Sequence, residues 1–109
     1  MKLTENLVQE LRRGTQTLAV LLTAGKRIYG YSLVGELQEA GIDIEQNTLY
    51  PLLRRLESQG LLESVWDTSE SRPRKYYAVT GAGRLMAEEL SGEWLRIHKV
   101  MSRMMNKEA

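Results

Sequence analysis

Residues 47–57 read Asn-Thr-Leu-Tyr-Pro-Leu-Leu-Arg-Arg-Leu-Glu and form the strongest local pattern in the chain. The leucines recur at three- and four-residue spacing, as on the buried side of a helix: Leu49, Leu52, Leu53 and Leu56. Asn47 and Thr48 are suitable N-cap residues, and Pro51 then lies in the first turn, where a missing N–H has no cost. The sequence therefore predicts a helix from this cap to Gly60.

The opposite side of this predicted helix is polar, basic and aromatic. At 100° per residue it presents six side chains: Asn47, Tyr50, Pro51, Arg54, Arg55 and Ser58. Adjacent arginines on a helix are more often a solvated face than a binding site. The role of this side therefore depends on the elements predicted around it.

Two helices are predicted before this one. Leucines at helical spacing indicate a first helix over residues 4–24. A second, shorter helix follows Gly30 and ends at Gly41. Ile42 and Ile44 then alternate with acidic residues, which predicts a short extended link to the third helix.

The chain after the third helix predicts a hairpin and one long helix. Residues 61–66 and 75–79 are rich in β-forming side chains and flank a turn-forming segment, residues 67–73. Thr80 is a suitable cap for a last helix that takes most of the remaining chain. The predicted order is helix, helix, helix, hairpin, long helix.

This order is typical of a winged helix-turn-helix, a mostly α fold with a small β-hairpin (α+β class). Residues 1–80 are the predicted DNA-binding domain, whose first helix also contributes to dimerisation. Residues 81–109 are the predicted C-terminal dimerisation helix, within the same compact unit. A chain of 109 residues is long enough for one such core.

The basic residues of the third helix and the hairpin suit two kinds of DNA contact. A major groove admits one helix, so Arg54 and Arg55 can make bidentate contacts with guanine or phosphate. Arg72, Arg74 and Lys75 on the hairpin, the wing, are expected to bind phosphates and to supply salt-sensitive affinity. Cations on both the helix and the wing favour DNA binding over a solvated face.

Apolar residues of the last helix alternate at four- and three-residue spacing, as in a heptad seam: Leu90, Trp94, Ile97, Met101 and Met104. Because leucines of the three earlier helices already supply a core, we expect this seam to pair with a second copy. Leu7 and Leu11 of the first helix are expected to join that interface. Such a homodimer reads two half-sites about 34 Å apart. The alternative is that the last helix folds back on its own domain.

Trp94 is the candidate residue for binding a small molecule. If the two-fold axis passes near it, paired indoles line a cavity for a flat apolar effector, although a Trp in mid-helix is most often core. His98 lies one turn away and is more often a solvated residue than a ligand. One His without any Cys predicts no metal site. The sequence also shows no catalytic constellation and no cofactor motif, and their absence argues against an enzyme.

The composition bounds the class of protein. With 42% hydrophobic and 27% charged residues the chain has the balance of a globular domain. Its net charge is only +1, so DNA binding would depend on a local cluster of basic residues and not on the total charge. The sequence shows no Cys, no signal-peptide pattern and no apolar stretch of membrane-spanning length. These features predict a cytoplasmic protein without disulfides or membrane contact.

Four segments resemble the PadR family of transcriptional regulators. They are residues 29–33 (Tyr-Gly-Tyr-Ser-Leu), 47–57, 60–64 (Gly-Leu-Leu-Glu-Ser) and 72–80 (Arg-Pro-Arg-Lys-Tyr-Tyr-Ala-Val-Thr). The run Thr-Leu-Tyr-Pro-Leu-Leu followed by Arg-Lys-Tyr-Tyr at this distance is specific. The resemblance covers most of the chain from Leu18 onward.

The resemblance implies a bacterial, dimeric winged helix, usually a repressor that a small molecule releases from its operator. The single C-terminal helix resembles a smaller subfamily in which the Trp matching Trp94 lies at the dimer centre and sandwiches planar compounds. The matching also implies which residues lie on the recognition helix and the wing: Asn47, Thr48, Tyr50 and Arg54, and then Arg74 and Lys75. His98 stands where members that bind cationic drugs carry an acidic group, which argues against a cationic effector.

We therefore predict a sequence-specific regulator, a repressor that binds a palindromic operator on double-stranded DNA as a homodimer. A small hydrophobic or aromatic effector is expected to release it. Two alternatives come from other classes: a winged helix that contacts only proteins, and a dimer that binds small molecules without operator binding. Binding that saturates on a defined palindrome and weakens steeply with salt would exclude the first alternative, and operator affinity itself would argue against the second.

Overall fold

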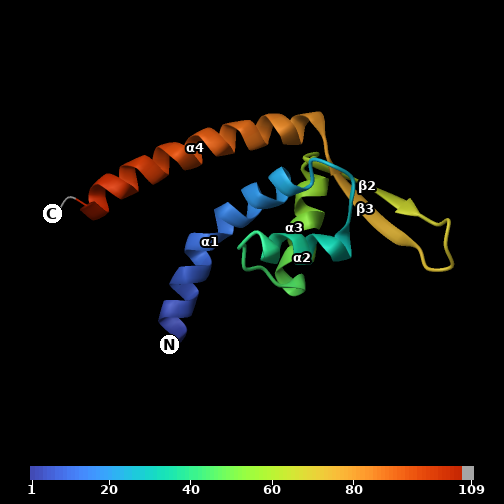
Figure 1. Cartoon of the computed structure of the whole chain (residues 1–109), viewed down its shortest axis with the longest axis horizontal. Coiled ribbons are helices and arrows are strands. Elements are labelled where there is room, and N and C mark those ends of the chain that lie inside the picture. Colours follow the sequence, from blue (N-terminus) through green and yellow to red (C-terminus); the bar gives the residue numbers. More distant parts are fainter. Residues whose placement is uncertain (107–109) are drawn as a thin grey trace.

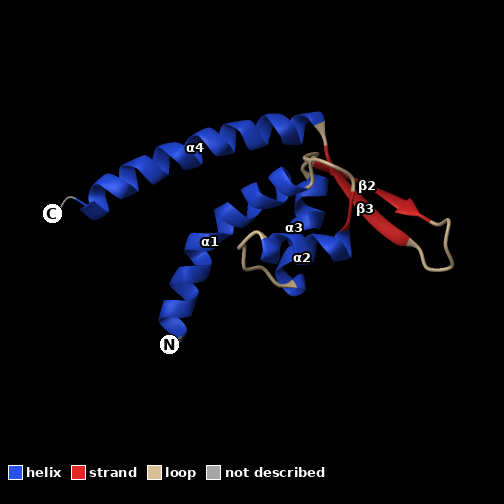
Figure 2. Ribbon diagram, viewed as in Figure 1, coloured by secondary structure: helices blue, strands red, loops and turns tan. Residues whose placement is uncertain are grey.

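Helices dominate the computed structural model, which describes residues 1–106 (Figures 1 and 2). The elements are α1 (Lys2–Thr23), β1 (Ile28–Tyr29), α2 (Gly30–Glu39), α3 (Gln46–Ser58), β2 (Leu62–Asp67), β3 (Arg74–Val79) and α4 (Gly81–Asn106). The predicted order of three helices, a hairpin and a long last helix is confirmed. The strands form one antiparallel sheet beside the first three helices.

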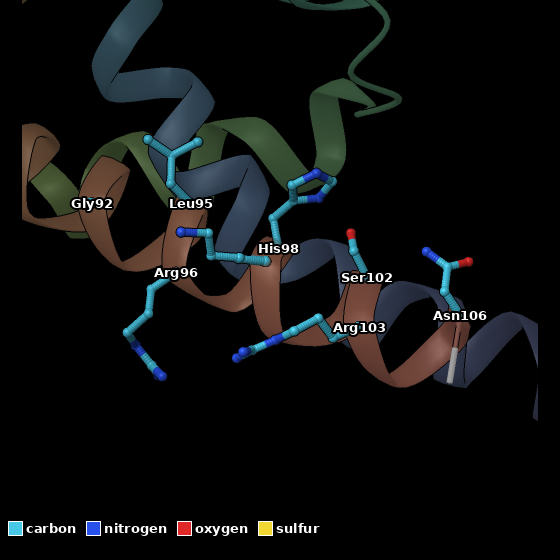
Figure 3. Close-up of a pocket in the computed structure, with 8 residues that line it drawn as sticks. Gly92, Leu95, Arg96, His98, Ser102, Arg103 and Asn106 are labelled. Atoms are coloured by element: carbon cyan, nitrogen blue, oxygen red, sulfur yellow. The ribbon is translucent and has the colours of Figure 1, made fainter. Parts of the chain in front are cut away.

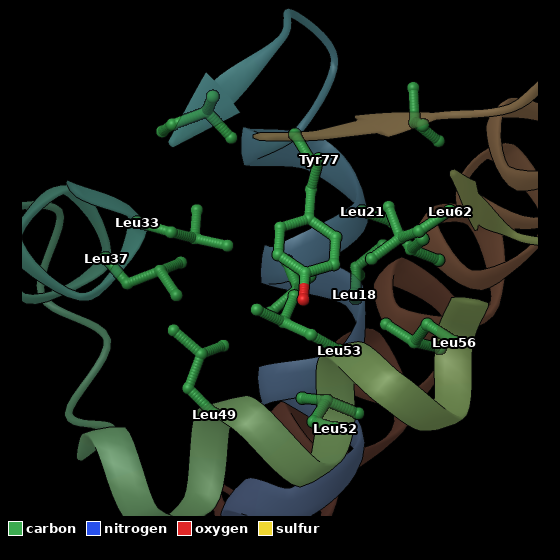
Figure 4. Close-up of a cluster of buried hydrophobic side chains, with 14 of the residues drawn as sticks. Leu18, Leu21, Leu33, Leu37, Leu49, Leu52, Leu53, Leu56, Leu62 and Tyr77 are labelled. Atoms are coloured by element: carbon green, nitrogen blue, oxygen red, sulfur yellow. The ribbon is translucent and has the colours of Figure 1, made fainter. Parts of the chain in front are cut away.

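The leucine stripe of α3 lies at the centre of the core (Figure 4). Leu49, Leu53 and Leu56 are at most 1% exposed and pack with leucines of α1 and α2. Tyr77 of β3 closes the core on the side of the sheet. Burying each leucine contributes roughly 1.5–3 kcal/mol. The core therefore fixes the orientation of α3 and, with it, the side of α3 that stays exposed.

The start of α3 differs from the prediction. Its N-cap is Glu45, whose backbone carbonyl accepts from the N–H groups of Thr48 (3.0 Å) and Leu49 (2.9 Å). Asn47 and Thr48 are therefore not caps but exposed residues of the first turn, and Pro51 lies inside the helix. Because Pro51 has no N–H, it leaves the Asn47 carbonyl without its usual helical donor.

A short strand that was not predicted completes the sheet. β1 pairs with β3, with Ile28 opposite Tyr77 and Tyr29 opposite Tyr76, so the strand order is β1-β3-β2. β2 and β3 form the predicted hairpin. Because side chains alternate between the two faces of a strand, Lys75 shares the core-facing side of β3 with Tyr77, and Tyr76 lies on the other side.

α4 begins on the domain and then extends away from it (Figure 1). Thr80 caps the helix as predicted, since the Gly83 N–H donates to Thr80 Oγ1 at 3.0 Å. Ala87 is buried and Leu90 is half-buried against the core, whereas nearly all later residues are exposed. Leu90 therefore makes an intramolecular contact, and its predicted place in the dimer seam stays a prediction. The alternative in which the helix folds back applies only to its beginning.

Candidate nucleic-acid interface

The exposed side of α3 carries most of the predicted base-reading residues. Asn47 and Thr48 are exposed in the first turn, and Arg54 is exposed two turns further along. Since Leu52 and Leu53 point into the core from the other side, these polar side chains are directed away from the domain. A rigid helix presents them, which favours precise contacts with a partner.

Arg55 takes a different direction from Arg54. Its Nη2 donates to Thr17 Oγ1 of α1 at 3.4 Å, so the guanidinium lies along the side of α3 that meets α1. A hydrogen bond of this length between exposed groups adds little stability. Arg55 is therefore a peripheral member of the polar side, whereas Arg54 is a central one.

Tyr50 links the polar side of α3 to the sheet. Its ring is half-buried, and both this ring and that of Tyr77 approach Gly30 at the start of α2. Burial raises the pKa of the Tyr50 phenol above its usual value, and repulsion from ionised Tyr29 raises it further. Tyr50 therefore stays protonated at physiological pH and keeps a hydroxyl that can donate a hydrogen bond.

The wing carries charges of both signs. Arg72 is exposed in the loop between the strands, and Arg74 Nη2 lies 3.8 Å from Glu70 Oε1. The Asp67 carboxylate accepts from the backbone N–H (3.0 Å) and the hydroxyl (2.7 Å) of Ser69, which lowers the pKa of Asp67. The wing is thus a folded loop with mixed charge, and Arg72 is its freest cation among the three that were predicted to bind phosphate.

Lys75 lies between the wing and α3. Its Nζ is 3.6 Å from Glu57 Oε1, in the last turn of α3, and 5.3 Å from the centre of the Tyr77 ring. Ser64 of β2 donates to the same Glu57 carboxylate. The Lys75 side chain is only 30% exposed. Lys75 therefore already has an acidic partner inside the domain, and its predicted contact with phosphate stays a prediction.

Tyrosines and arginines cover the outer side of the sheet, and among them only Arg74 was a predicted site residue. Arg27 lies over the Tyr76 ring at 5.1 Å, Arg74 lies over the Tyr29 ring at 5.3 Å, and the rings of Tyr29 and Tyr31 stack 6.1 Å apart. Each cation–π contact of this exposed kind contributes about 0.5–1 kcal/mol. The Tyr-Gly-Tyr run at residues 29–31 was the available signal, but only the pairing of β1 with β3 brings the other members beside it.

The exposed apolar side chains of α1 and α4 include all remaining members of the predicted dimer interface. These residues are between 43% and 80% exposed: Leu7, Leu11, Trp94, Ile97, Met101 and Met104. The N-terminal part of α1 and the C-terminal part of α4 diverge from each other (Figure 1). Apolar surface exposed over two helices is typical of a protein contact.

Trp94 lines one of two open hollows along α4. Its ring stacks in parallel on that of His98, with 5.2 Å between centroids and 5° between planes. The hollow that Trp94 lines is an apolar groove of 330 Å³ between α1 and α4, and Leu18 lines it too. His98, Arg96 and Arg103 line a second, more basic hollow, whose lining residues all belong to α4 (Figure 3). A single chain encloses neither hollow.

Other kinds of site are not found in residues 1–106. No three His, Asp or Glu side chains in this range gather closely enough to hold a metal ion. No helix in the same range combines the length and the apolar character needed to cross a membrane. The features that remain are α3, the wing and the exposed apolar sides of α1 and α4.

Residues 18–89 match the model of the transcriptional regulator PadR-like family. The chain belongs to the PadR family. The crystal structure of a PadR family transcriptional regulator from Eggerthella lenta is similar over 96% of this chain and 94% of that one, with 45% sequence identity and a TM-score of 0.87. A Streptococcus transcriptional regulator shows 31% identity and a TM-score of 0.79 over 88% of this chain and 97% of that one. Transcriptional regulator Rv3488 of Mycobacterium tuberculosis is 36% identical over 83 residues, which are 75% of this chain and 78% of that protein.

Membership of the PadR family establishes the general activity. PadR-family proteins are DNA-binding transcriptional regulators and not enzymes. The family match runs from the second half of α1 to the first part of α4 and so includes α3 and the wing. It does not include Trp94, His98 or the exposed leucines at the start of α1. The predicted family and fold are confirmed.

Proposed function

We propose that this PadR-family protein is a homodimeric repressor that binds a palindromic operator and is released by a small planar or apolar effector. The exposed polar side of α3, next to the wing, is the observation that carries the proposal. A helix fits the major groove, where each base pair presents a distinct pattern of donors and acceptors. Side chains on a rigid helix can therefore read sequence, while the wing meets the backbone.

Base reading is assigned to one side of α3 and phosphate binding to the residues around it. Arg54 offers two parallel donors that match guanine, and Asn47 matches adenine in the same way. Thr48 and Tyr50 add hydroxyl groups on the same side of the helix. Two groups are assigned to phosphates: Arg72 and Arg74 on the wing, and Arg55 on the side near α1. Arg74 exchanges the Glu70 carboxylate for a phosphate when DNA binds.

The exposed apolar seam of α4 supports pairing with a second copy of the chain. Trp94, Ile97 and Met101 keep the spacing of a heptad, and a two-fold axis would cover them with the same residues of the other copy. Leu7 and Leu11 lie on the diverging end of α1, which leaves room for a partner helix against α4. Such a dimer presents two copies of α3 to successive turns of one side of the duplex.

The parallel stack of Trp94 and His98 supports the effector part of the proposal. The two rings are parallel, and the outer face of such a stack suits another planar aromatic molecule. The apolar groove beside Trp94 would be closed by the second copy in the proposed dimer. Arg103, in the hollow beside His98, disfavours a cationic effector. The charge of Arg96 is already balanced by Glu93, with 2.7 Å between Arg96 Nε and Glu93 Oε2.

Selection of DNA from a random-sequence library tests this function. The purified protein is mixed with random duplexes at low and at physiological salt, and bound duplexes are amplified and sequenced. We expect a palindrome whose half-sites lie about one helical turn apart. Planar aromatic compounds that quench Trp fluorescence are then added to the complex, and at least one class should release the DNA. No enriched sequence at either salt would contradict operator binding and favour protein contact or ligand binding alone.

A further inference from the structure

Glu57 lies where the last turn of α3 meets both strands of the wing. Its carboxylate accepts a hydrogen bond from Ser64 of β2, and its Oε1 lies 3.6 Å from Lys75 Nζ of β3. Ser64 is opposite Tyr77 in the hairpin, so Ser64 and Lys75 lie next to each other on the side that faces α3. One side chain of the recognition helix therefore holds both strands of the wing.

Aromatic rings fix Lys75 on its other sides. Its Nζ lies 5.3 Å from the centre of the Tyr77 ring and 5.9 Å from that of Trp66. Tyr77 belongs to the buried core, so this contact ties Lys75 to the domain itself. A cation held by a carboxylate and two rings has little freedom to follow a phosphate. Arg72, in contrast, is exposed in the loop at the end of the wing.

We propose that Glu57 is a positioning residue that fixes the angle between the wing and α3 through Ser64 and Lys75. The inference rests on the proposed operator binding, because it concerns how α3 and the wing engage one duplex together. Fixing the angle in the free protein lowers the entropy lost on binding. The gain is greatest on the operator, where base contacts by α3 and phosphate contacts by the wing form at once.

Glu57→Gln tests the proposal because the two possible roles of Lys75 predict opposite changes in operator affinity. A phosphate contact predicts tighter binding, and a role in positioning the wing predicts weaker binding. If Lys75 contacted phosphate, removing the carboxylate would free this cation and strengthen binding to every duplex. Loss of the wing position should instead weaken operator binding about fivefold, the effect of losing one well-placed, partly exposed ion pair. Affinity for a scrambled duplex should be unchanged or slightly higher. Equal or tighter operator binding by Glu57→Gln would overturn the proposal.

Fluorescence anisotropy measures both affinities, on the duplex that the wild-type protein selects from the random library and on a scrambled duplex of the same length. Glu63→Gln is the matched control, because Glu63 lies one residue before Ser64, on the other side of β2, and is exposed. It removes the same charge without touching Lys75. We expect Glu63→Gln to leave operator binding unchanged or stronger. A fivefold loss in this control as well would contradict a specific role for Glu57.

Lys75→Met separates positioning from phosphate contact through the salt dependence. Operator affinity should fall about fivefold, while the slope of log affinity against log salt stays at the wild-type value. A slope reduced by about one unit would identify Lys75 as a phosphate contact and overturn the proposal. The double variant Glu57→Gln/Lys75→Met should bind no more weakly than either single variant, because both remove one interaction.

Amide hydrogen exchange of the free protein tests the contact without DNA. In Glu57→Gln the amides of β2 and β3 should exchange about fivefold faster, while those of the core helices keep their rates. Unchanged exchange in the hairpin would overturn the proposal even if operator binding is found. If exchange in the hairpin is faster but the random library yields no enriched duplex, the contact between α3 and the wing is supported. The proposed operator binding, and with it any dependence of operator binding on Glu57, is then contradicted.

Discussion

Gly83→Ala should destabilise the protein, against the usual effect of this substitution in a helix. Gly83 is buried in the first turn of α4. A Cβ at this position would overlap the backbone carbonyl of Leu61 and would lie 2.5 Å from Cγ2 of Val79. The Leu61 carbonyl also accepts from the Thr80 N–H at 3.1 Å. The new methyl group can therefore be accommodated only by moving backbone that joins α4 to the wing.

The structure gives the magnitude of this effect. Replacing Gly by Ala within a helix stabilises by at most about 1 kcal/mol. Overpacking against fixed neighbours costs about 1–3 kcal/mol, and disturbing the hydrogen bond from Thr80 to Leu61 costs roughly 1 kcal/mol more. We expect a net loss of about 2 kcal/mol in the free energy of unfolding.

Urea unfolding at one fixed protein concentration measures this change, since stability of a dimer depends on concentration. Gly35→Ala is the matched control: Gly35 lies in the middle of α2, and a Cβ there meets nothing within 4 Å. The control should gain about 0.5–1 kcal/mol. Stabilisation by both substitutions would contradict the close packing of α4 on Leu61.

Three further predictions concern the proposed interface. Arg54→Ala should reduce operator affinity by about 1–3 kcal/mol and relax the preference at one base pair, as measured by anisotropy on single-base variants of the selected duplex. Arg72→Ala should weaken all duplexes about equally and lower the salt slope by about one unit; a change of base preference instead would contradict its assignment to phosphate. Trp94→Ala should weaken dimerisation in sedimentation experiments, or abolish quenching by planar compounds, while α3 and its side chains remain intact. Wild-type dimerisation together with wild-type quenching would contradict both proposed roles of Trp94.

The sequence predicts the positions of the helices well, because a helix that is buried on one side has apolar residues at a regular three- and four-residue spacing. The leucines of α3 recur at helical spacing, and the core contains all of them. Thr80 is another local signal, because its hydroxyl accepts from the Gly83 N–H, only three residues further along the chain. Cap prediction fails at Asn47 because the backbone of Glu45 already accepts the first helical hydrogen bonds, so α3 begins earlier in the chain.

Features that depend on distant contacts are not visible in the sequence. β1 is two residues long and shows no alternation of its own, because pairing with Tyr76 and Tyr77 defines it. Lys75 resembles its basic neighbours in the sequence, yet its partner Glu57 comes from the preceding helix. Leu90 continues the heptad of α4 but packs on the core, because the start of α4 passes over the domain. The spacing of a seam does not reveal where a helix leaves its domain.

Competition between the selected duplex and a scrambled duplex at physiological salt is the most direct test of sequence-specific binding by α3. Labelled operator is bound by the wild-type protein and displaced by increasing amounts of each unlabelled duplex. We expect the selected duplex to compete at least about a thousandfold more effectively, the lower range for specific DNA-binding proteins. A ratio near one, with affinity that falls equally with salt on both duplexes, would show binding to phosphates alone and would contradict sequence reading by α3.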